Sequence, residues 1–354
     1  MANKKQKKPF LLYLVILVLI LALAVLGGLT VLSSQKLAGL QKKVTELMQN
    51  VEALTDSAKS LSEKAQELEG LTQKSDAQAS AATPTPEAPG EGTLSPSQGS
   101  TFTDNTDAEM DALLSQIQGL LPANNGSWSV YVCNLALNSQ GSINNAPMQA
   151  ASLIKLYIMG AVYENYESLS QQYGAETLDS NLNAMITVSD NDAANTLVGY
   201  LGGGDTTAGM NAVNQFCTSH GFQQTSMGRL LLASNENGDN YTSVEDCGKF
   251  MKAVYQLANG GSSEISLAHA DAMYALLNAQ TRRNKIPAQI PEGVSVANKT
   301  GELADVENDA AIIYNTPKGK DLVICFMSEN VSDAGAAQTA IAQNSRMIYG
   351  YYNE

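Results

Sequence analysis

Three short polar motifs in the C-terminal part of the chain constrain its fold and chemistry most strongly. In chain order they are Ser152-x-x-Lys155, Ser189-Asp190-Asn191 and Lys299-Thr300-Gly301. Each is common alone, but together they require a fold that gathers distant positions at one site. The chain has only two histidines, His220 and His269, and both lie outside the motifs. The sequence therefore favours a serine activated by a lysine over a Ser-His-Asp triad.

The first motif pairs a nucleophile with a base. Ser152 precedes an apolar stretch, residues 153–163, that predicts a helix. Serine suits a helix start, and Lys155, three residues later, lies on the same helix face. Serine is a weak nucleophile until a base takes its proton, which a lysine does when burial and nearby positive charge lower its pKa. Taken alone, the pair also fits a capping serine followed by a surface lysine.

The other two motifs offer a proton relay and a binding site for an anion. Ser189 is predicted to pass a proton to the departing amine, and Asn191 to hold a substrate amide. Lys299 and Thr300 end a predicted strand and suit a substrate carboxylate, while Gly301 allows a close backbone approach. The alternatives are a capped helix start at 189–191 and an ordinary strand-end lysine. Only the joint occurrence of the motifs favours the catalytic interpretation.

The order of predicted elements indicates an α+β domain. From N- to C-terminus we expect a helix at Asp107–Leu121, strands at Ser127–Cys133 and Gly141–Asn145, helical stretches within Ser152–Gln280, and strands at Val294–Lys299, Asp309–Tyr314 and Leu322–Met327. Strands at both ends with helices between them predict an antiparallel sheet built from both ends of the domain, with the helices packed against it.

The N-terminal part predicts a membrane anchor. Residues 1–9 form a basic tail, and the 23 residues 10–32 are apolar and uncharged, long enough to cross a ~30 Å hydrocarbon core. Lysines before the span predict a cytoplasmic N-terminus and a catalytic domain outside the cell membrane. The alternative is a cleaved signal peptide, with Ala22-Leu23-Ala24 as the processing site. Both interpretations export the rest of the chain.

A stalk and a linker are predicted between the anchor and the domain. Residues 33–74 carry apolar positions alternately three and four apart, with leucine throughout one register (40, 47, 54, 61 and 68). This period is typical of a coiled coil and predicts a homodimer, although a lone amphipathic helix also fits. Residues 75–105 are rich in Pro, Ser and Thr without periodicity, which predicts a disordered tether. Residues 106–354 then form the catalytic domain.

Charge and cysteine content narrow the function further. The net charge is −14, and −18 without the four N-terminal lysines, which argues against nucleic acid as a partner. The four cysteines (Cys133, Cys217, Cys247 and Cys325) lack metal-ligand spacing, and we expect no metal or cofactor. Buried free thiols are the favoured interpretation, with a Cys133–Cys325 bridge as the alternative if their strands are neighbours.

The three motifs resemble those of the class A β-lactamase catalytic domain, part of a superfamily that includes D-Ala-D-Ala peptidases and penicillin-binding proteins. The resemblance covers most of residues 107–354. Further stretches that carry it are 150–156, 277–281 before Ile286-Pro287, 296–303 and 308–312.

This resemblance implies a mechanism. Ser152 would attack a lactam or peptide carbonyl while Lys155 helps to remove its proton. Lys299, Thr300 and Ser189 would hold the substrate carboxylate and shuttle protons. The backbone N–H groups of Ser152 and Glu302 would form the oxyanion hole.

Two departures from the class A pattern affect the expected reaction. Class A enzymes carry a loop glutamate that activates the deacylating water, and in the corresponding segment, 229–235, Leu231 occupies its position. Glu236 and Glu245 are weaker candidates for that base, while Asn235 matches the family's loop asparagine and is expected to bind substrate or water. Ser152 and Ser189 are also only 37 positions apart, which predicts a more open cleft.

The sequence therefore predicts a membrane-anchored serine hydrolase of the class A β-lactamase type, with slow deacylation of a β-lactam acyl-enzyme. The alternatives are a D-Ala-D-Ala carboxypeptidase or penicillin-binding protein acting on peptidoglycan stem peptides, and a non-catalytic scaffold associated with the wall.

Overall fold

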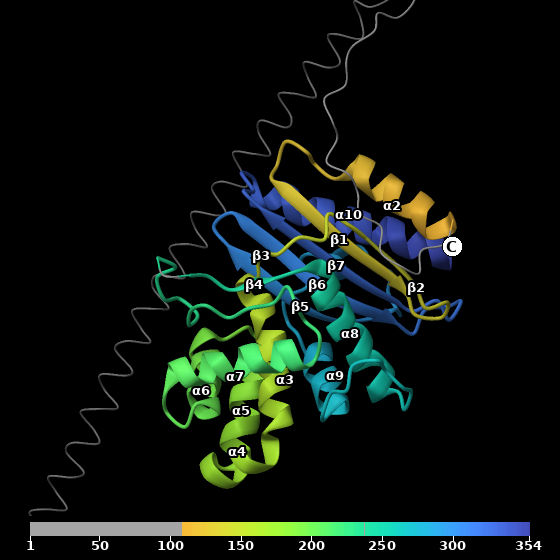
Figure 1. Cartoon of the computed structure of the whole chain (residues 1–354). Coiled ribbons are helices and arrows are strands. Elements are labelled where there is room, and N and C mark those ends of the chain that lie inside the picture. Colours follow the sequence, from red (N-terminus) through yellow and green to blue (C-terminus); the bar gives the residue numbers. More distant parts are fainter. Residues whose placement is uncertain (1–107, 237) are drawn as a thin grey trace, which may run out of the picture. The chain divides into compact units, whose positions relative to one another are not determined.

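The computed structural model describes residues 108–236 and 238–354, which nearly coincide with the predicted catalytic domain (Figure 1). The predicted basic tail (1–9), anchor (10–32), stalk (33–74) and linker (75–105) lie outside the described residues. Their roles in membrane attachment and dimerisation therefore stay predictions. Within the described part of the chain, no helix has the length and apolar character needed to cross a membrane.

Five strands form one antiparallel sheet in the order β2-β1-β7-β6-β5. Their bounds are β1 Ser127–Asn134, β2 Ser139–Ile143, β5 Ser295–Leu303, β6 Val306–Tyr314 and β7 Leu322–Glu329. Two strands come from the beginning of the domain and three from its end, so the predicted α+β fold with a sheet built from both ends is confirmed. β5 lies at one edge of the sheet, with β6 as its single neighbour in this sheet.

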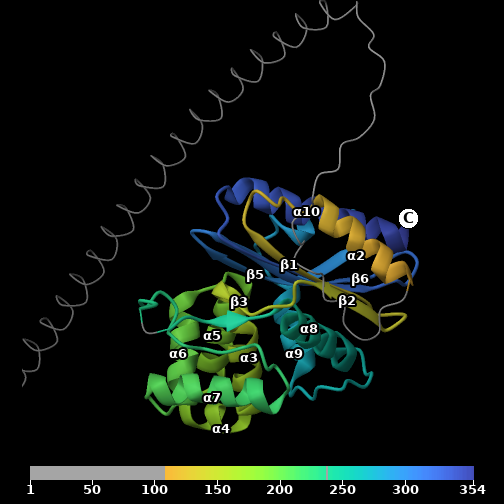
Figure 2. The ribbon, with the colours of Figure 1, turned by 45° about the horizontal axis from the view of Figure 1, so that its top comes forward.

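Helices cover both faces of the sheet, and alternating side chains of its strands serve the two faces. On β1, Val130 and Val132 pack with the helices α2 (Ala108–Leu120) and α10 (Ala334–Asn353). The neighbouring Tyr131 and Cys133 belong to the second core, which contains the remaining helices. Figures 1 and 2 show α2 and α10 together on one side of the sheet and α8 on the other. Helix α10 was not expected from the sequence.

The second face carries the mainly helical middle of the chain. Its helices are α3 Ile154–Glu164, α4 Tyr166–Tyr173, α5 Ala175–Thr187, α6 Asn191–Leu201, α7 Thr206–Ser219, α8 Val244–Ala258 and α9 Ala270–Asn278. A two-stranded sheet of β3 (Met148–Gln149) and β4 (Tyr241–Thr242) joins this region at the start of the first motif. The edge strand β5 runs beside the one-turn 3-10 helix η1 (Ala151–Leu153) that precedes α3.

All four cysteines are buried and free, as the favoured interpretation predicted. β1 and β7 are neighbours, yet Cys133 pairs in register with Val323, and Cys325 pairs with Tyr131. The alternative Cys133–Cys325 bridge is therefore not formed, because the two thiols are offset along the strands.

Candidate active site

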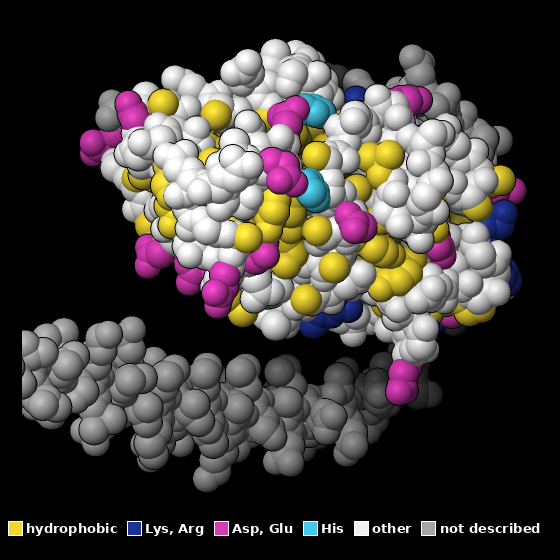
Figure 3. All heavy atoms as spheres, turned by 90° about the horizontal axis from the view of Figure 1, so that it is seen from below, with side chains coloured by type: hydrophobic (Ala, Val, Ile, Leu, Met, Phe, Trp, Pro, Cys, Tyr) yellow, Lys and Arg dark blue, Asp and Glu magenta, His cyan; other side chains and the backbone are white. Residues whose placement is uncertain are grey.

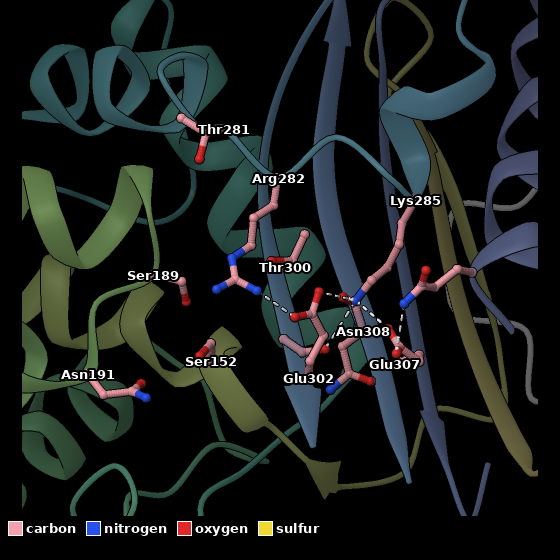
Figure 4. A network of polar contacts seen from close by, with 12 residues as sticks. Ser152, Ser189, Asn191, Thr281, Arg282, Lys285, Thr300, Glu302, Glu307 and Asn308 are labelled. Carbon is pink, nitrogen blue, oxygen red and sulfur yellow. Dashed lines mark hydrogen bonds and ion pairs between the residues drawn. The ribbon is translucent and has the colours of Figure 1, made fainter. Parts of the chain in front are cut away.

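The three motifs meet where the helical region faces the edge strand β5. There a cavity of about 110 Å³ is lined entirely by polar residues: Ser152, Ser189, Asn191, Arg282, Thr300 and Glu302. Each of the three motifs contributes at least one lining residue. Figure 4 shows the side chains of Ser152, Ser189, Asn191 and Arg282 directed toward the same space. The fold thus brings together residues that lie far apart in the sequence.

Left-handed backbone conformations present the two serines. Ala151, which precedes Ser152 in η1, has φ = +48°, and Ser189 has φ = +62°. Non-glycine residues adopt this region rarely, at a cost on the order of 1–3 kcal/mol each, and such residues cluster at functional sites. Ser152 makes no side-chain cap for the helix, contrary to the capping alternative. Its hydroxyl is instead directed into the cavity (Figure 4).

Lys155 connects the first two motifs. Its Nζ atom lies 3.1 Å from Ser152 Oγ, 3.1 Å from Ser189 Oγ, 2.6 Å from the Ser189 carbonyl oxygen and 2.7 Å from Asn191 Oδ1. An ammonium has only three hydrogens for these four oxygens. When the amine is neutral it donates two hydrogen bonds, and its lone pair can accept a proton from the Ser152 hydroxyl.

Electrostatics favour this neutral form. Lys155 is fully buried. Burial lowers the pKa of Lys155 to about 7, a shift that Asp190 opposes and that the charge of Arg282 reinforces. A lysine with such a pKa is half neutral near physiological pH, so it is available as a general base.

Ser189 links this lysine to a second one. Its Oγ atom lies 2.9 Å from Lys299 Nζ, and Lys299 also donates to the Thr300 carbonyl oxygen at 2.7 Å. Burial and the neighbouring charge of Lys155 lower the pKa of Lys299 well below its ordinary value. Ser189 Oγ thus lies between the two lysine amines, and its function as a proton relay stays a prediction.

The glycine of the third motif permits the contact between β5 and η1. A Cβ atom at Gly301 would lie 2.8 Å from the Ala150 carbonyl oxygen and 3.2 Å from the backbone nitrogen of Ser152. Any side chain would therefore push the edge strand away from the nucleophile. Lys299 and Gly301 lie behind the cavity wall rather than on it, whereas Thr300 and Asn191 line it.

A chain of ion pairs beside the cavity was missed by the sequence analysis (Figure 4). Arg282 Nη1 lies 2.7 Å from Glu302 Oε2, and Lys285 Nζ lies 3.1 Å from Glu302 Oε1 and 2.7 Å from Glu307 Oε2. Burial raises the pKa of Glu302, but Lys285 and Arg282 outweigh it and lower the pKa overall. Three basic residues within positions 282–285 of an acidic chain were the signal that could have revealed this group.

The loop at 229–239 places Leu231, not a carboxylate, next to α6. Leu231 is buried in the core, and the Asn195 amide binds its backbone on both sides, at 2.9 Å to its nitrogen and 3.1 Å to its oxygen. Arg229 and Asp239 close the loop through an ion pair of 2.6 Å. This contact of Asn195 with the Leu231 backbone was not expected from the sequence.

The other loop candidates lie away from the cavity. Asn235 and Glu236 are exposed, and neither is among the lining residues. Glu245 belongs to α8, where it accepts a hydrogen bond from Ser142 and pairs with Lys249. The structure therefore brings neither glutamate to Ser152, and a function for Asn235 at the site stays a prediction. Among the described residues, His, Cys, Asp and Glu form no group of three that could hold a metal ion.

Comparison with known proteins identifies the family. A model described as "Beta-lactamase enzyme family" matches residues 112–176 and 170–352. The chain belongs to this beta-lactamase enzyme family. Among curated relatives, the β-lactamase CARB-4 of Pseudomonas aeruginosa is 24% identical over 192 residues, which are 52% of this chain and 63% of that protein. The match thus spans less than two thirds of that β-lactamase.

Solved structures agree with this membership at the level of the fold. PBP-A (24% identity, TM-score 0.57) covers 68% of this chain and 96% of its own. The β-lactamase from Sphaerobacter thermophilus DSM 20745 has 23% sequence identity and a TM-score of 0.56, and the match covers 68% of this chain and 97% of that one. The class A β-lactamase from Mycobacterium abscessus has 20% sequence identity and a TM-score of 0.56, and the match covers 68% of this chain and 100% of that one. The described domain therefore has the beta-lactamase fold.

Proposed function

We propose that the protein is a serine acyl-enzyme hydrolase of the class A β-lactamase type, with Ser152 as the nucleophile and Lys155 as its base. The observation that carries this proposal is the position of Lys155 Nζ, which lies 3.1 Å from both Ser152 Oγ and Ser189 Oγ. A buried lysine with a pKa of about 7 between two serine hydroxyls suits proton transfer in both directions.

The acylation step follows from these contacts. The Ser152 oxygen bonds to the carbonyl carbon of a β-lactam, and the hydroxyl proton passes to Lys155. The carbon–nitrogen bond then breaks, and the proton reaches the departing nitrogen through Ser189. The backbone N–H groups of Ser152 and Glu302 are the proposed donors to the oxyanion, and losing one such donor typically costs ~10²–10³ in rate.

The cavity suits a substrate that carries a carboxylate. Its walls are polar, and Arg282 supplies a cation on the lining while Thr300 supplies a hydroxyl. Lys299 is fully buried and directed to Ser189 and the Thr300 carbonyl oxygen, so it influences a bound substrate through these two groups and not by direct contact.

Deacylation is expected to be slow. Leu231 cannot activate water, and Glu302 is the single carboxylate among the residues lining the cavity. Its pKa is lowered and its two oxygens are paired with Arg282 and Lys285, which makes it a poor base. This observation favours the second candidate function, a D-Ala-D-Ala carboxypeptidase or penicillin-binding protein acting on peptidoglycan stem peptides.

Attachment to the cell membrane and dimerisation are part of the proposal on sequence grounds alone. They rest on the apolar segment 10–32 and the heptads of 33–74, with the domain held outside the membrane. Figure 3 shows acidic side chains at many places on the face that it presents and basic ones at few. This distribution supports small-molecule or peptide substrates over nucleic acid.

The test is to mix the purified full-length chain with a reporter β-lactam and to follow adduct formation and decay by intact-protein mass spectrometry. A long-lived adduct, absent in Ser152→Ala and present in the surface control Ser168→Ala, supports the proposal. Cleavage of a D-Ala-D-Ala peptide favours the second candidate, and rapid release of hydrolysed product favours efficient lactamase activity. If the unaltered chain forms no adduct, the catalytic proposal is overturned and the alternative of a non-catalytic scaffold remains.

A further inference from the structure

Lys285 is a fully buried lysine just behind the proposed oxyanion hole. Besides its pairs with Glu302 and Glu307, its Nζ atom lies 3.0 Å from the carbonyl oxygen of Asn308 and 3.4 Å from that of Gly301. The Glu307 carboxylate is held in turn by Gln338 of α10, at 3.0 Å. One ammonium thus joins the ends of β5 and β6 (Figure 4).

The direction of the Gly301 carbonyl group shows where the next N–H group points. The Gly301 carbonyl and the Glu302 N–H belong to one peptide unit, and in a trans peptide they point in opposite directions. Gly301 pairs in register with Asn308, and Lys285 binds the carbonyl oxygens of both, so the Gly301 carbonyl points toward β6. The Glu302 N–H therefore points to the free edge of the sheet, where Ser152 lies.

Asn308 fixes the second oxyanion donor from the same place. Its side-chain amide donates to the carbonyl oxygens of Gln149 at 2.9 Å and Ala150 at 3.3 Å, immediately before the turn that carries Ser152. Its side-chain oxygen accepts from the Ser328 backbone nitrogen of β7 at 3.0 Å. The turn at Ser152 and the peptide at Glu302 are thus both anchored to position 308.

We propose that Lys285 is a positioning residue for the oxyanion hole: its ammonium holds the Gly301–Glu302 peptide in the orientation that directs the Glu302 N–H at the reacting carbonyl. The inference rests on the proposed function, because it concerns the same acylation step. A cation on the Gly301 carbonyl oxygen also polarises this amide and strengthens its N–H as a donor. Lys285 does not line the cavity, so it acts through the peptide and not on the substrate.

A purely structural role for Lys285 predicts a different result. Replacing a buried ion-pair partner can reduce stability without changing the reaction, because it leaves a carboxylate unpaired. The two roles separate when the rate of acylation is measured per folded site and resolved into substrate binding and the chemical step. A positioning residue changes the chemical step, whereas a structural one changes the amount of folded protein.

The experiment compares Lys285→Met with the unaltered full-length chain, using the acylation rate constant and the dissociation constant of the preceding complex. The double variant Lys285→Met/Glu307→Gln removes the orphaned carboxylate and serves if the single variant folds poorly. Lys249→Met, which removes an ion-paired lysine of α8 away from the cavity, is the matched control. We expect acylation to slow by roughly tenfold to a hundredfold, less than for deletion of a donor, with the dissociation constant nearly unchanged.

The outcomes distinguish this inference from the proposed function. If the parent chain is acylated and the folded Lys285 variants are acylated at the same rate, the positioning role is overturned and the proposal of Ser152 catalysis still stands. A parent chain that forms no adduct overturns the proposed function instead. The positioning role is then decided by crystal structures of the parent and the double variant: a turned Gly301 carbonyl supports it, and an unchanged one contradicts it.

Discussion

The Nζ atom of Lys155 lies 3.1 Å from the Oγ atom of Ser152 although the two residues belong to different helical segments. Ser152 sits in the 3-10 turn η1, and Lys155 sits in the first turn of α3. The left-handed conformation of Ala151 turns the chain so that hydroxyl and amine share the cavity side. With this geometry, we expect the rate of acylation to depend on the protonation state of Lys155.

The rate of acylation is expected to rise with pH through about 7. Only neutral Lys155 accepts the Ser152 proton, and burial lowers its pKa to about 7, so the active fraction increases above that pH. Stopped-flow acylation by a reporter β-lactam between pH 5 and 9 measures this profile. Lys155→Arg, whose guanidinium stays protonated, should acylate at least about a hundredfold more slowly at every pH. A flat profile in the parent chain would refute the assignment of Lys155 as base.

Replacing Arg282 with methionine should move the same profile to higher pH. The Arg282 charge helps to lower the pKa of Lys155, after burial as the main cause, so without Arg282 that pKa rises. Affinity for carboxylate-bearing substrates should fall in parallel, since Arg282 lines the cavity. Arg346→Met, which removes an arginine paired with Glu354 instead, provides the control. An unshifted midpoint would show that Arg282 does not influence Lys155.

Leu231→Glu is expected to accelerate loss of the acyl adduct by at least about tenfold, because it restores a base for water. It should also lower the free energy of unfolding by roughly 1–3 kcal/mol, since a polar group replaces a buried leucine. The adjacent Leu232 is 78% exposed, so Leu232→Glu should change neither quantity. Adduct lifetime by mass spectrometry and denaturant unfolding measure the two effects. Equal lifetimes for both variants would argue against Leu231 occupying the deacylation position.

Gly301→Ala should slow acylation by roughly ten- to a hundredfold through displacement of an oxyanion donor. The added Cβ would lie 2.8 Å from the Ala150 carbonyl oxygen, so β5 must move away from Ser152. Gly199→Ala in α6 is the matched control, because its Cβ meets no atom within 4 Å. That control should be stabilised by about 0.5–1 kcal/mol with normal acylation. Normal acylation by Gly301→Ala would show that the close approach is dispensable.

Local patterns predicted much of this fold. The alternating strand β1, the continuous apolar run of β7 and the apolar helix α3 follow from patterns among neighbouring residues. The C-terminal helix α10 was missed because alanine, glycine and polar residues dilute its apolar positions, and packing against α2 and the sheet supplies what the pattern lacks.

In the candidate site too, residues of short motifs were predicted from the sequence, whereas residues that depend on long-range contacts were not. Short motifs in the sequence contain Ser152, Lys155 and Ser189, and the structure places the side chains of the two serines in contact with Lys155. Lys285 and Asn308 were not found, since their contacts depend on strand register and on the direction of single carbonyl groups. Asn195 was missed for a similar reason, because its partner Leu231 is 36 residues away in the sequence.

The four buried, free thiols are natural probes for local opening of the domain. Cys133 and Cys325 sit in sheet strands, Cys247 in α8, and Cys217 in α7 of the helical region. A thiol reagent can react with each only when its surroundings open, so labelling rates report the opening free energy of sheet and helices separately.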